Sequence, residues 1–541
     1  MRLFPPWPRA ATPAVLGRAL GLIKAALVAS LLSACPALAG VPEMVQGKVF
    51  LDANGNGKLD AGEEGIAGVR VTDSITFVKT AADGSYAIEV SADPLFPQKG
   101  SQVISLSWPS GKWPTGKWWA RLDQISDAKN VHFGLRAEKQ SGPFMFAHIT
   151  DDHSSGGVVA NYGRHFPHMA EALEFVFNTG DMGYAGPDNA DKMFSDILNN
   201  GRTLPVPIFF VPGNHDYVGI HQTEWRKQHP LYGAGAYTKY LGPIRWSFDY
   251  AESHFVGIDW ATPHGDGKLE GGVPPIALEF LRRDLELAEE GANLFVFVHY
   301  PSISAGALQV KKFTAVYVFG GHSHQFRMWR QGNLIYTTQI ALWGAGSCGL
   351  VHVDGRNVEF LYRCAGGKWG DWKSYAQAGH HVGYCPLHRF ALETWPRMEK
   401  SRKAIKTIAE QPFSGSRTVD AGAPDRVVQI ELEVARGAAR QVGLKLGGEG
   451  KVLEISWDGT WLICDGIRVP MPLREWEKTL RLRVIVDRKI MQMQANGMYE
   501  FSRPMPAEKL GVEAFAAGGE ATIKTFGVYR HVPAETDKPK N

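Results

Sequence analysis

Histidines and aspartates follow five apolar stretches of this 541-residue chain, and their side chains are typical metal ligands. The segments are Asp151-Asp152-His153, Gly180-Asp181, Gly213-Asn214-His215-Asp216, His299 and Gly321-His322-Ser323-His324. Imidazole, carboxylate and amide ligands suit Mn, Fe or Zn, whereas Cu(I) prefers sulfur. Two divalent ions about 3.5–4 Å apart can clamp a phosphoryl group and activate a water. The segments therefore indicate two-metal phosphoryl chemistry, with the two oxygens of Asp181 as the natural bridge.

Each segment stands at the end of a run of β-branched and aromatic residues, which predicts a buried strand that leads into a loop. The runs are residues 144–149, 175–178, 208–211, 294–298 and 315–319. Open α/β sheets gather ligands at the carboxyl ends of their strands, so the five loops can share one crevice. Apolar spacing predicts a helix over residues 274–290, and residues 161–173 are a second candidate helix. The alternation of strands and helices is typical of an α/β sandwich.

The ordered series resembles the calcineurin-like metallophosphoesterase superfamily, whose pattern is D-x-H, G-D, G-N-H-D/E, H and G-H-x-H. The resemblance covers about residues 142–365 and implies a four-layer α/β sandwich. It also implies two metal sites that share Asp181, the first with Asp151, His153 and His324 and the second with Asn214, His299 and His322. It further implies hydrolysis of phosphate mono- or diesters by a hydroxide that bridges the metals, with His215 as general acid and Asp216 orienting it.

Tyr184 completes a G-D-x-x-Y segment that also resembles purple acid phosphatases, in which this tyrosine binds ferric iron. Those enzymes lack the histidine of the D-x-H element, which is present here as His153. We therefore interpret Tyr184 as a residue that lines the pocket or supports the ligands. Five other histidines match no element of the pattern, and we expect structural roles for them: His148, His165, His168, His254 and His264.

The beginning of the chain predicts export. Basic residues precede an apolar run over residues 25–32, and small residues follow, as in a secretory signal over residues 1–39. Two processing sites compete: Ala37-Leu38-Ala39 suits ordinary cleavage, and Leu32-Ser33-Ala34-Cys35 resembles a lipoprotein box with a lipid anchor on Cys35. The expected location is extracytoplasmic: periplasmic, secreted or lipid-anchored at the cell surface. No later stretch approaches the roughly 20 apolar residues that span a bilayer.

The net charge bears on nucleic-acid binding, and the cysteine content bears on disulfide bonds. The net charge is +3 with a pI near 8.4, and no basic stripe predicts nucleic acid as a partner. Four cysteines follow the signal, and an oxidising compartment would permit three pairings among Cys348, Cys364, Cys385 and Cys464. The loop that joins Cys364 to Cys385 favours that pair, and buried thiols remain the alternative.

Residues 42–137 precede the catalytic segment and predict a small β-sandwich, with strands near residues 47–51, 69–72, 76–79 and 86–90. The segment Gly65-Ile66-Ala67-Gly68-Val69 resembles the opening strand of immunoglobulin-like repeats in bacterial surface proteins. The first turn of the predicted sandwich has oxygen-bearing side chains at the spacing of an EF-hand loop, so structural calcium is a candidate ligand. An Asn/Gly-rich turn that needs no ion is the alternative. The residues concerned are Asp52, Asn54, Asn56, Lys58, Asp60 and Glu63.

Residues 371–424 are expected to form a connecting arm with a helix near residues 395–410, and residues 426–532 predict a C-terminal β-sandwich. From Leu482 to Arg503 the chain resembles the terminal sandwich of invertase-like glycoside hydrolases. No paired catalytic carboxylates accompany that resemblance. Glycan contact is the functional interpretation of Trp457, Trp461 and Trp476, and core packing is the structural one.

The multidomain chain thus leaves three functional hypotheses. The first is an exported metallophosphoesterase. The alternatives are a surface adhesion or glycan-binding protein with an accessory central domain, and a polysaccharide hydrolase.

Overall fold

The computed structural model describes residues 41–531, except for residues 94, 97, 141, 158, 161–168, 187, 219–232, 264–268, 325–326, 340, 343–346, 365–400, 423–426, 449–450, 471–477, 488–489, 497–498 and 505–508. The expected signal segment, Cys35 and the proposed Cys364–Cys385 bond therefore fall wholly or partly outside the described residues. Cys348 and Cys464 are both buried. Within the described part of the chain, no helix is both long and apolar enough to cross a membrane.

The first part of the chain is β-rich, as its turn-separated apolar runs predict. One four-stranded sheet has the order β4-β1-β8-β6, with strands Ser85–Glu89, Met44–Leu51, Phe133–Ala137 and Lys112–Pro114. The other has the order β3-β2-β5-β7, with strands Phe77–Lys79, Arg70–Thr72, Val103–Ser107 and Trp119–Arg121. Val49 from the first sheet and Leu106 from the second belong to one hydrophobic cluster, so the two sheets share a core.

Two further sheets form the central part. In one, the parallel strands β9 (Phe144–Ile149), β10 (Phe175–Asn178) and β11 (Ile208–Phe210) are followed beyond β9 by the antiparallel pair β20 (Ser347–Asp354) and β21 (Asn357–Cys364). The other has the order β12-β13-β16-β17-β19-β18, and its strands are Trp246–Tyr250, Ser253–Gly257, Asn293–Phe297, Ala315–Gly320, Leu334–Thr338 and Arg327–Gln331. The middle strands β13, β16, β17 and β19 are parallel.

Phenylalanines fill the space between these two central sheets. Phe146 on β9 meets Phe295 on β16 edge to face at 5.3 Å, and Phe177 on β10 stacks on Phe297 at 3.8 Å between ring centroids. Alternate residues of a strand point to the same face, so these strands present one aromatic face each to the other sheet. Offset and edge-to-face ring pairs add to the hydrophobic burial. The packing fixes the two sets of strand ends relative to one another.

Helices accompany the central strands. The expected helix over residues 274–290 is α5 (Pro275–Leu287), which begins at a proline and buries Phe280, Leu281 and Leu285. Of the second candidate, the structure describes α2 (Met169–Ala172). The helices α3 (Ala190–Gly201) and α4 (Gly235–Tyr240) lie in the loops that follow β10 and β11.

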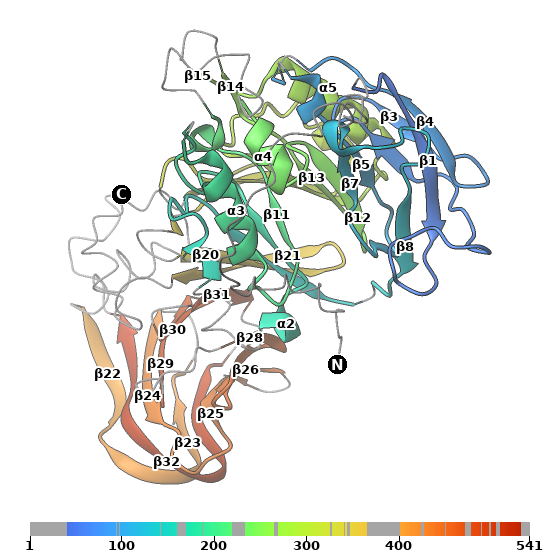
Figure 1. The fold of residues 1–541 in the computed structure, drawn as a ribbon. Coiled ribbons are helices and arrows are strands. Elements are labelled where there is room, and N and C mark those ends of the chain that lie inside the picture. The colour runs from blue at the N-terminus through green and yellow to red at the C-terminus, as the bar shows by residue number, and fades with distance from the viewer. Residues whose placement is uncertain are drawn as a thin grey trace, which may run out of the picture. The chain divides into compact units, whose positions relative to one another are not determined.

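The last part of the chain is antiparallel and entirely β within the described residues. Its strands are β22 (Arg402–Ile408), β23 (Gln411–Asp420), β24 (Val428–Ala435), β25 (Gln441–Gly448), β26 (Lys451–Trp457), β27 (Trp461–Cys464), β28 (Ile467–Pro470), β29 (Thr479–Asp487), β30 (Ile490–Ala495), β31 (Tyr499–Pro504) and β32 (Gly511–His531). The long strand β32 pairs with β22, β23, β24 and β25 (Figure 1).

The structure tests two expectations for this last part, a helix near residues 395–410 and the role of its tryptophans. The helix expected near residues 395–410 is wrong where the structure describes it, because β22 occupies residues 402–408. Pairing with β32 and the β-branched residues of this run outweigh its scattered helix formers. Trp457 and Trp461 are buried at 3% and 5% exposure, which confirms core packing and removes them as sugar platforms; Trp476 lies outside the described residues.

Buried charges join the N-terminal strands to the central ones. The Arg245 guanidinium, which is fully buried, donates hydrogen bonds to Asp93 Oδ2 at 2.7 Å and to the Asp259 carboxylate at 2.5 and 3.1 Å. It also donates to the Ser74 carbonyl oxygen at 3.3 Å. Because a buried charge without partners is costly, the N-terminal residues Asp93 and Ser74 complete a network that the central strands cannot satisfy alone.

A second network lies around His254 on β13. Its Nδ1 is 2.6 Å from Asp249 Oδ1 on β12, and its Nε2 is 2.7 Å from Asp284 Oδ2 on α5. Arg70 on β2 donates to Asp249 Oδ2 at 2.6 Å. The pKa of His254 is about 9, because the two carboxylates outweigh the effect of burial, which alone would lower it. The carboxylates of Asp249 and Asp284 therefore face two cations, His254 on the central strand β13 and Arg70 on the N-terminal strand β2.

Candidate metal centre

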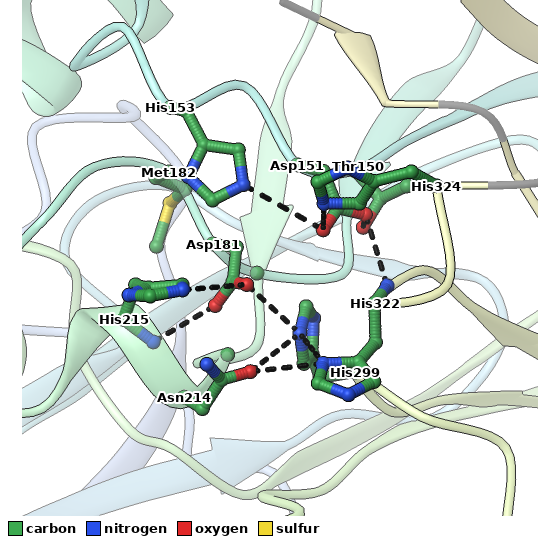
Figure 2. Close-up of polar contacts among 12 residues, drawn as sticks. Thr150, Asp151, His153, Asp181, Met182, Asn214, His215, His299, His322 and His324 are labelled. Carbon is green, nitrogen blue, oxygen red and sulfur yellow. Dashed lines mark hydrogen bonds and ion pairs between the residues drawn. The ribbon is translucent and has the colours of Figure 1, made fainter. Parts of the chain in front are cut away.

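Seven side chains of the predicted ligand series lie together at the carboxyl ends of parallel strands (Figure 2). Asp151 and His153 follow β9, Asp181 follows β10 and Asn214 follows β11. The remaining three, His299, His322 and His324, follow β16 and β17 of the second central sheet. The crevice thus draws on both sheets whose aromatic faces pack together.

The first group contains Asp151, His153 and His324, whose ligand atoms lie within 4.8 Å of one another. Asp151 Oδ1 is 3.1 Å from His324 Nε2 and 3.9 Å from His153 Nε2. This oxygen is buried and accepts no hydrogen bond from the described residues. Thr150 Oγ1 and the His322 amide donate to the other oxygen, Oδ2, at 2.8 and 3.0 Å. One carboxylate oxygen is therefore anchored, and the other faces two imidazoles.

The second group contains Asp181, His299 and His322, and the amide oxygen of Asn214 joins it. His299 Nε2 lies 3.1 Å from Asn214 Oδ1, 3.2 Å from Asp181 Oδ2 and 3.2 Å from His322 Nδ1. His299 Nδ1 is 2.7 Å from the Thr179 carbonyl oxygen, which can only accept, so Nδ1 carries a proton and Nε2 is the ring atom that points into the group.

These contacts fit a pair of cations. Four nitrogen and oxygen atoms that can bind a metal converge in the second group: His299 Nε2, His322 Nδ1, Asn214 Oδ1 and Asp181 Oδ2. The donors are nitrogen and oxygen only, which suits Mn, Fe or Zn. Asp181 belongs to the second group, and its charge also acts on His153 of the first. A shared carboxylate at this position is therefore compatible with the geometry.

Backbone strain concentrates at the same residues. Five of the seven candidate ligands have positive φ angles although they are not glycine: Asp151 (53°), His153 (46°), Asp181 (54°), His322 (63°) and His324 (52°). This left-handed region is uncommon for such residues and costs of order 1 kcal/mol or more each. Strained residues of this kind cluster at functional sites, so the backbone is an independent sign that the loops are arranged for binding.

Asp216 holds two of the ligand loops together. Its Oδ2 accepts hydrogen bonds from the amides of Asp181 at 2.7 Å and Gly213 at 2.8 Å, and its Oδ1 accepts one from Met182 at 3.0 Å. The family resemblance implies that Asp216 orients the His215 ring. The contacts described here are with backbone amides, so Asp216 positions His215 through the loop, and direct contact with the ring stays a prediction.

His215 lies at the open edge of the site with 29% of its side chain exposed. Its amide donates to Asp181 Oδ1 at 2.9 Å, and its Nε2 is 4.0 Å from Asp181 Oδ2. The backbone contact places the ring next to Asp181 while a face remains accessible to a bound molecule. This location suits a residue that acts on substrate.

The electrostatics reflect the concentration of acids and imidazoles. Burial opposes ionisation of Asp181, but the charge and hydrogen bond of His299 outweigh it and hold the Asp181 pKa below its usual range. Conversely, Asp181 overcomes the effect of burial and raises the pKa of His299 to about 9. Burial and the charge of Asp181 raise the pKa of Asp216 to about 7. Burial lowers the pKa of His153 and of His322.

Several residues at the site were not singled out from the sequence. Trp260 lies 4.8 Å from the His322 ring and 5.9 Å from the His299 ring, between centroids. Tyr300 lies 5.5 Å from His322 and is 37% exposed. Thr150 and Thr179 anchor Asp151 and His299. Thr150, Thr179 and Tyr300 stand directly before or after pattern residues, which was the available signal, whereas Trp260 has no pattern residue beside it.

The remaining site predictions concern the five histidines outside the pattern and the candidate calcium loop. His148 is buried with Nε2 2.9 Å from Thr179 Oγ1, and His254 belongs to the carboxylate network, so both have structural partners. His165, His168 and His264 lie outside the described residues. Among the described residues, the two groups above are those that bring three acidic or histidine ligand atoms within 4.8 Å, and neither includes the candidate calcium loop.

In the candidate calcium loop, protein groups occupy most of the oxygens. The Asp52 carboxylate accepts the amides of Gly55 and Gly57, each at 2.7 Å, and Asp60 Oδ2 accepts the side-chain amides of Asn54 and Asn56 at 2.8 and 2.7 Å. These bonds make a turn that closes on itself. Calcium binding there stays a prediction.

Comparison with protein families identifies the central part. The family model for calcineurin-like phosphoesterases matches residues 144–326, which contain all seven candidate ligands and His215. Residues 144–326 form a calcineurin-like phosphoesterase domain. The match confirms the resemblance drawn from the D-x-H, G-D, G-N-H-D and G-H-x-H segments. No curated protein matches the chain significantly in sequence.

Solved structures similar to parts of the chain are distant. A conserved uncharacterised protein and predicted phosphoesterase from Streptococcus pneumoniae is 14% identical, covers 46% of this chain and 96% of its own, and has a TM-score of 0.22. Aspergillus kawachii beta-fructofuranosidase is 17% identical over 26% of this chain, with a TM-score of 0.21. An alginate lyase of polysaccharide lyase family 7 is 10% identical over 22% of this chain, with a TM-score of 0.18. The chain spans 29% of the fructofuranosidase and 63% of the lyase.

Proposed function

We propose that this protein is an exported, two-metal phosphoesterase. The observation that carries the proposal is that His299 Nε2, Asn214 Oδ1 and His322 Nδ1 lie within 3.2 Å of one another beside Asp181, with a second acid and imidazole group next to them. Residues of the family-matched segment supply both groups. Asp151, His153 and His324 would hold the first ion; Asn214, His299 and His322 would hold the second; and Asp181 would serve both.

Two bound cations would supply charge stabilisation for the phosphoryl oxygens and a water more acidic than bulk water. In the overall reaction, an oxygen of water forms a bond to phosphorus, the bond from phosphorus to the leaving oxygen breaks, and one water proton is released to solvent. We assign His215 to the leaving side, where a ring nitrogen gives its proton to the departing oxygen and regains one from solvent.

The contacts of neighbouring residues suit these roles. The amide of His215 donates to Asp181 Oδ1, so the acid is held beside the carboxylate that both ions would share. Asp216 fixes the same two loops through three backbone amides. Thr179 keeps Nε2 of His299 directed into the site. These bonds hold the groups in place before substrate arrives, which is how protein sites reduce the cost of reaching the transition state.

The test uses the mature chain loaded with Mn²⁺ or Zn²⁺, with bis(4-nitrophenyl) phosphate and 4-nitrophenyl phosphate as substrates. We expect turnover of at least one ester, and Asp181→Asn should abolish it and lower the bound metal. Asp127→Asn, an exposed carboxylate in the N-terminal part, is the matched control and should retain both. Full metal content without turnover of either ester would refute the proposal.

Export and domain organisation are part of the same proposal. Residues 1–39 would be removed after Ala39 or, in the lipid-anchored alternative, cut before Cys35, and the mass of the mature N-terminus distinguishes the two. The domains would comprise residues 42–137 and 142–365 and a C-terminal β-sandwich that includes β22 and β23 besides residues 426–532, because both strands pair with β32; the connecting arm expected over residues 371–424 is therefore wrong from residue 402 to residue 420. A four-layer central sandwich would lie between the two β-sandwiches. We do not favour the glycan-binding alternative, because Trp457 and Trp461 are buried. Binding to a glycan array that survives Asp181→Asn would favour it.

A further inference from the structure

Tyr184 is an exposed aromatic residue at the edge of the candidate metal centre. It is 58% exposed, although Met182, two residues earlier, is fully buried. Its ring stacks on His153 with centroids 4.9 Å apart and planes at 22°, and it meets His215 edge-on at 4.6 Å. Two imidazoles therefore support one part of the ring, while much of the side chain is open to solvent.

Hydrogen bonds fix the loop that carries this ring. The Ala185 amide donates to the His215 carbonyl oxygen at 2.8 Å, which ties the residue after Tyr184 to the loop of the proposed acid. Asn189 closes the other side, because its Nδ2 donates to the Tyr184 carbonyl oxygen at 3.0 Å and its Oδ1 accepts from Gly186 at 2.7 Å. A ring that is already held in place loses little conformational entropy when a ligand stacks on it.

The position of Tyr184 also assigns it to one side of the site. Figure 2 shows His215 and His153 on one side of Asp181, and His299 and His322 on the other. Tyr184 contacts the first pair, whereas the aromatic residues Trp260 and Tyr300 contact the second. If His215 protonates the leaving oxygen, the group attached to that oxygen must lie beside His215, within reach of Tyr184.

We propose that Tyr184 is a platform for the leaving group and that the preferred substrates are phosphate esters whose leaving group has a flat aromatic face, such as an aryl or nucleobase-bearing group. The inference rests on the proposed function, because the leaving group lies beside Tyr184 only if His215 protonates the leaving oxygen. Flat rings stack on exposed tyrosine without a need for specific hydrogen bonds, so the platform would select by shape and polarisability. The hydroxyl group is not required for this role.

The test compares two anions that cannot be hydrolysed as esters, phenylphosphonate and methylphosphonate, by calorimetric titration of the metal-loaded full chain. Loss of a stacking partner weakens binding by roughly 5- to 150-fold. Tyr184→Ala should therefore weaken phenylphosphonate binding at least fivefold and change methylphosphonate binding less than twofold. Tyr184→Phe keeps the ring and should leave both affinities within twofold.

Tyr300→Ala is the matched control, because Tyr300 is an exposed tyrosine on the opposite side of the centre. It should change the affinities for the two anions by the same factor. An equal effect of Tyr184→Ala on both anions, or no effect on either, overturns the platform. Loss of metal in Tyr184→Phe also overturns it, since the hydroxyl group would then be a ligand.

The two proposals fail separately in this design. If the wild-type protein hydrolyses nitrophenyl esters and Tyr184→Ala shows no selective loss for the aryl anion, only the platform is wrong. If the metal-loaded wild-type protein neither hydrolyses an ester nor binds either phosphonate, the phosphoesterase proposal falls and the platform falls with it.

Discussion

Replacement of His254 by glutamine should remove a pH dependence of stability that the wild-type protein shows above neutrality. His254 lies between Asp249 and Asp284, and Arg70 from the N-terminal sheet neutralises Asp249. Lys312 is a further cation whose charge acts on Asp284. His254 and Asp284 are fully buried, while Asp249 is 26% exposed, so water screens only one side of the group.

The magnitude follows from the difference between the folded and unfolded states. The pKa of His254 is about 9 in the folded protein and 6.5 in its ordinary state. Since one pKa unit corresponds to 1.36 kcal/mol, the retained proton stabilises the folded protein by about 3 kcal/mol. This contribution is fully present below pH 6.5, where both states are protonated. It declines as pH rises and is lost above pH 9, where both states are neutral.

The assay is urea unfolding of metal-loaded protein at pH 6, 7.5 and 9, followed by circular dichroism and fluorescence so that a two-state transition can be verified. The difference in unfolding free energy between the wild type and His254→Gln should shrink by about 3 kcal/mol from pH 6 to pH 9. The other titrating groups are present in both proteins, so their contributions cancel in this difference. His132→Gln is the control. Partial burial lowers the pKa of His132, so His132 should not cause a loss of stability of the wild-type protein as pH rises from 6 to 9. A constant difference between wild type and His254→Gln would refute the reasoning.

Three further predictions concern the interface and the site. Asp93→Ala should lower the free energy of unfolding by about 3–5 kcal/mol, measured by urea unfolding, because it leaves a buried guanidinium partly unpaired. Gly321→Ala should lower the bound metal measured by mass spectrometry, because a Cβ there would lie 2.2 Å from Asp151 Oδ2; Gly116→Ala, where the nearest atom is 3.6 Å away, should not. His215→Ala should slow ester turnover by about 10²–10⁴-fold with unchanged metal content, and metal loss would contradict its assignment as the acid.

The strands and the clustering of the ligand residues were predictable from the sequence, because both depend on local patterns. Apolar runs mark β9, β10, β16 and β17, and parallel strands must end at the same edge of a sheet. Once the strands are known, the polar residues that follow them are expected at the carboxyl edge of the sheet. The same logic did not extend to the strand β22, whose pairing partner lies more than 100 residues away in β32.

The support around the ligands was less accessible. The Asp216 carboxylate accepts three backbone amides, and the sequence contains no signal for such bonds; its expected contact with the His215 ring stays a prediction. Trp260 and Tyr300 reach the site because β13 and β16 are neighbours, which depends on sheet order. The Arg245 network likewise depends on contacts between residues 152 positions apart. Long-range pairing of this kind requires three-dimensional information.

The Asp93–Arg245–Asp259 contact also bears on how this chain can be divided or recombined. Excision of the first hundred residues would leave a guanidinium in an apolar interior opposite a single acid, and the remainder would tend to aggregate or be degraded. Grafting the central segment onto another leader would have the same outcome unless Arg245 were replaced at the same time. The leading strands are therefore expected to behave as a structural part of the central domain rather than as an interchangeable module.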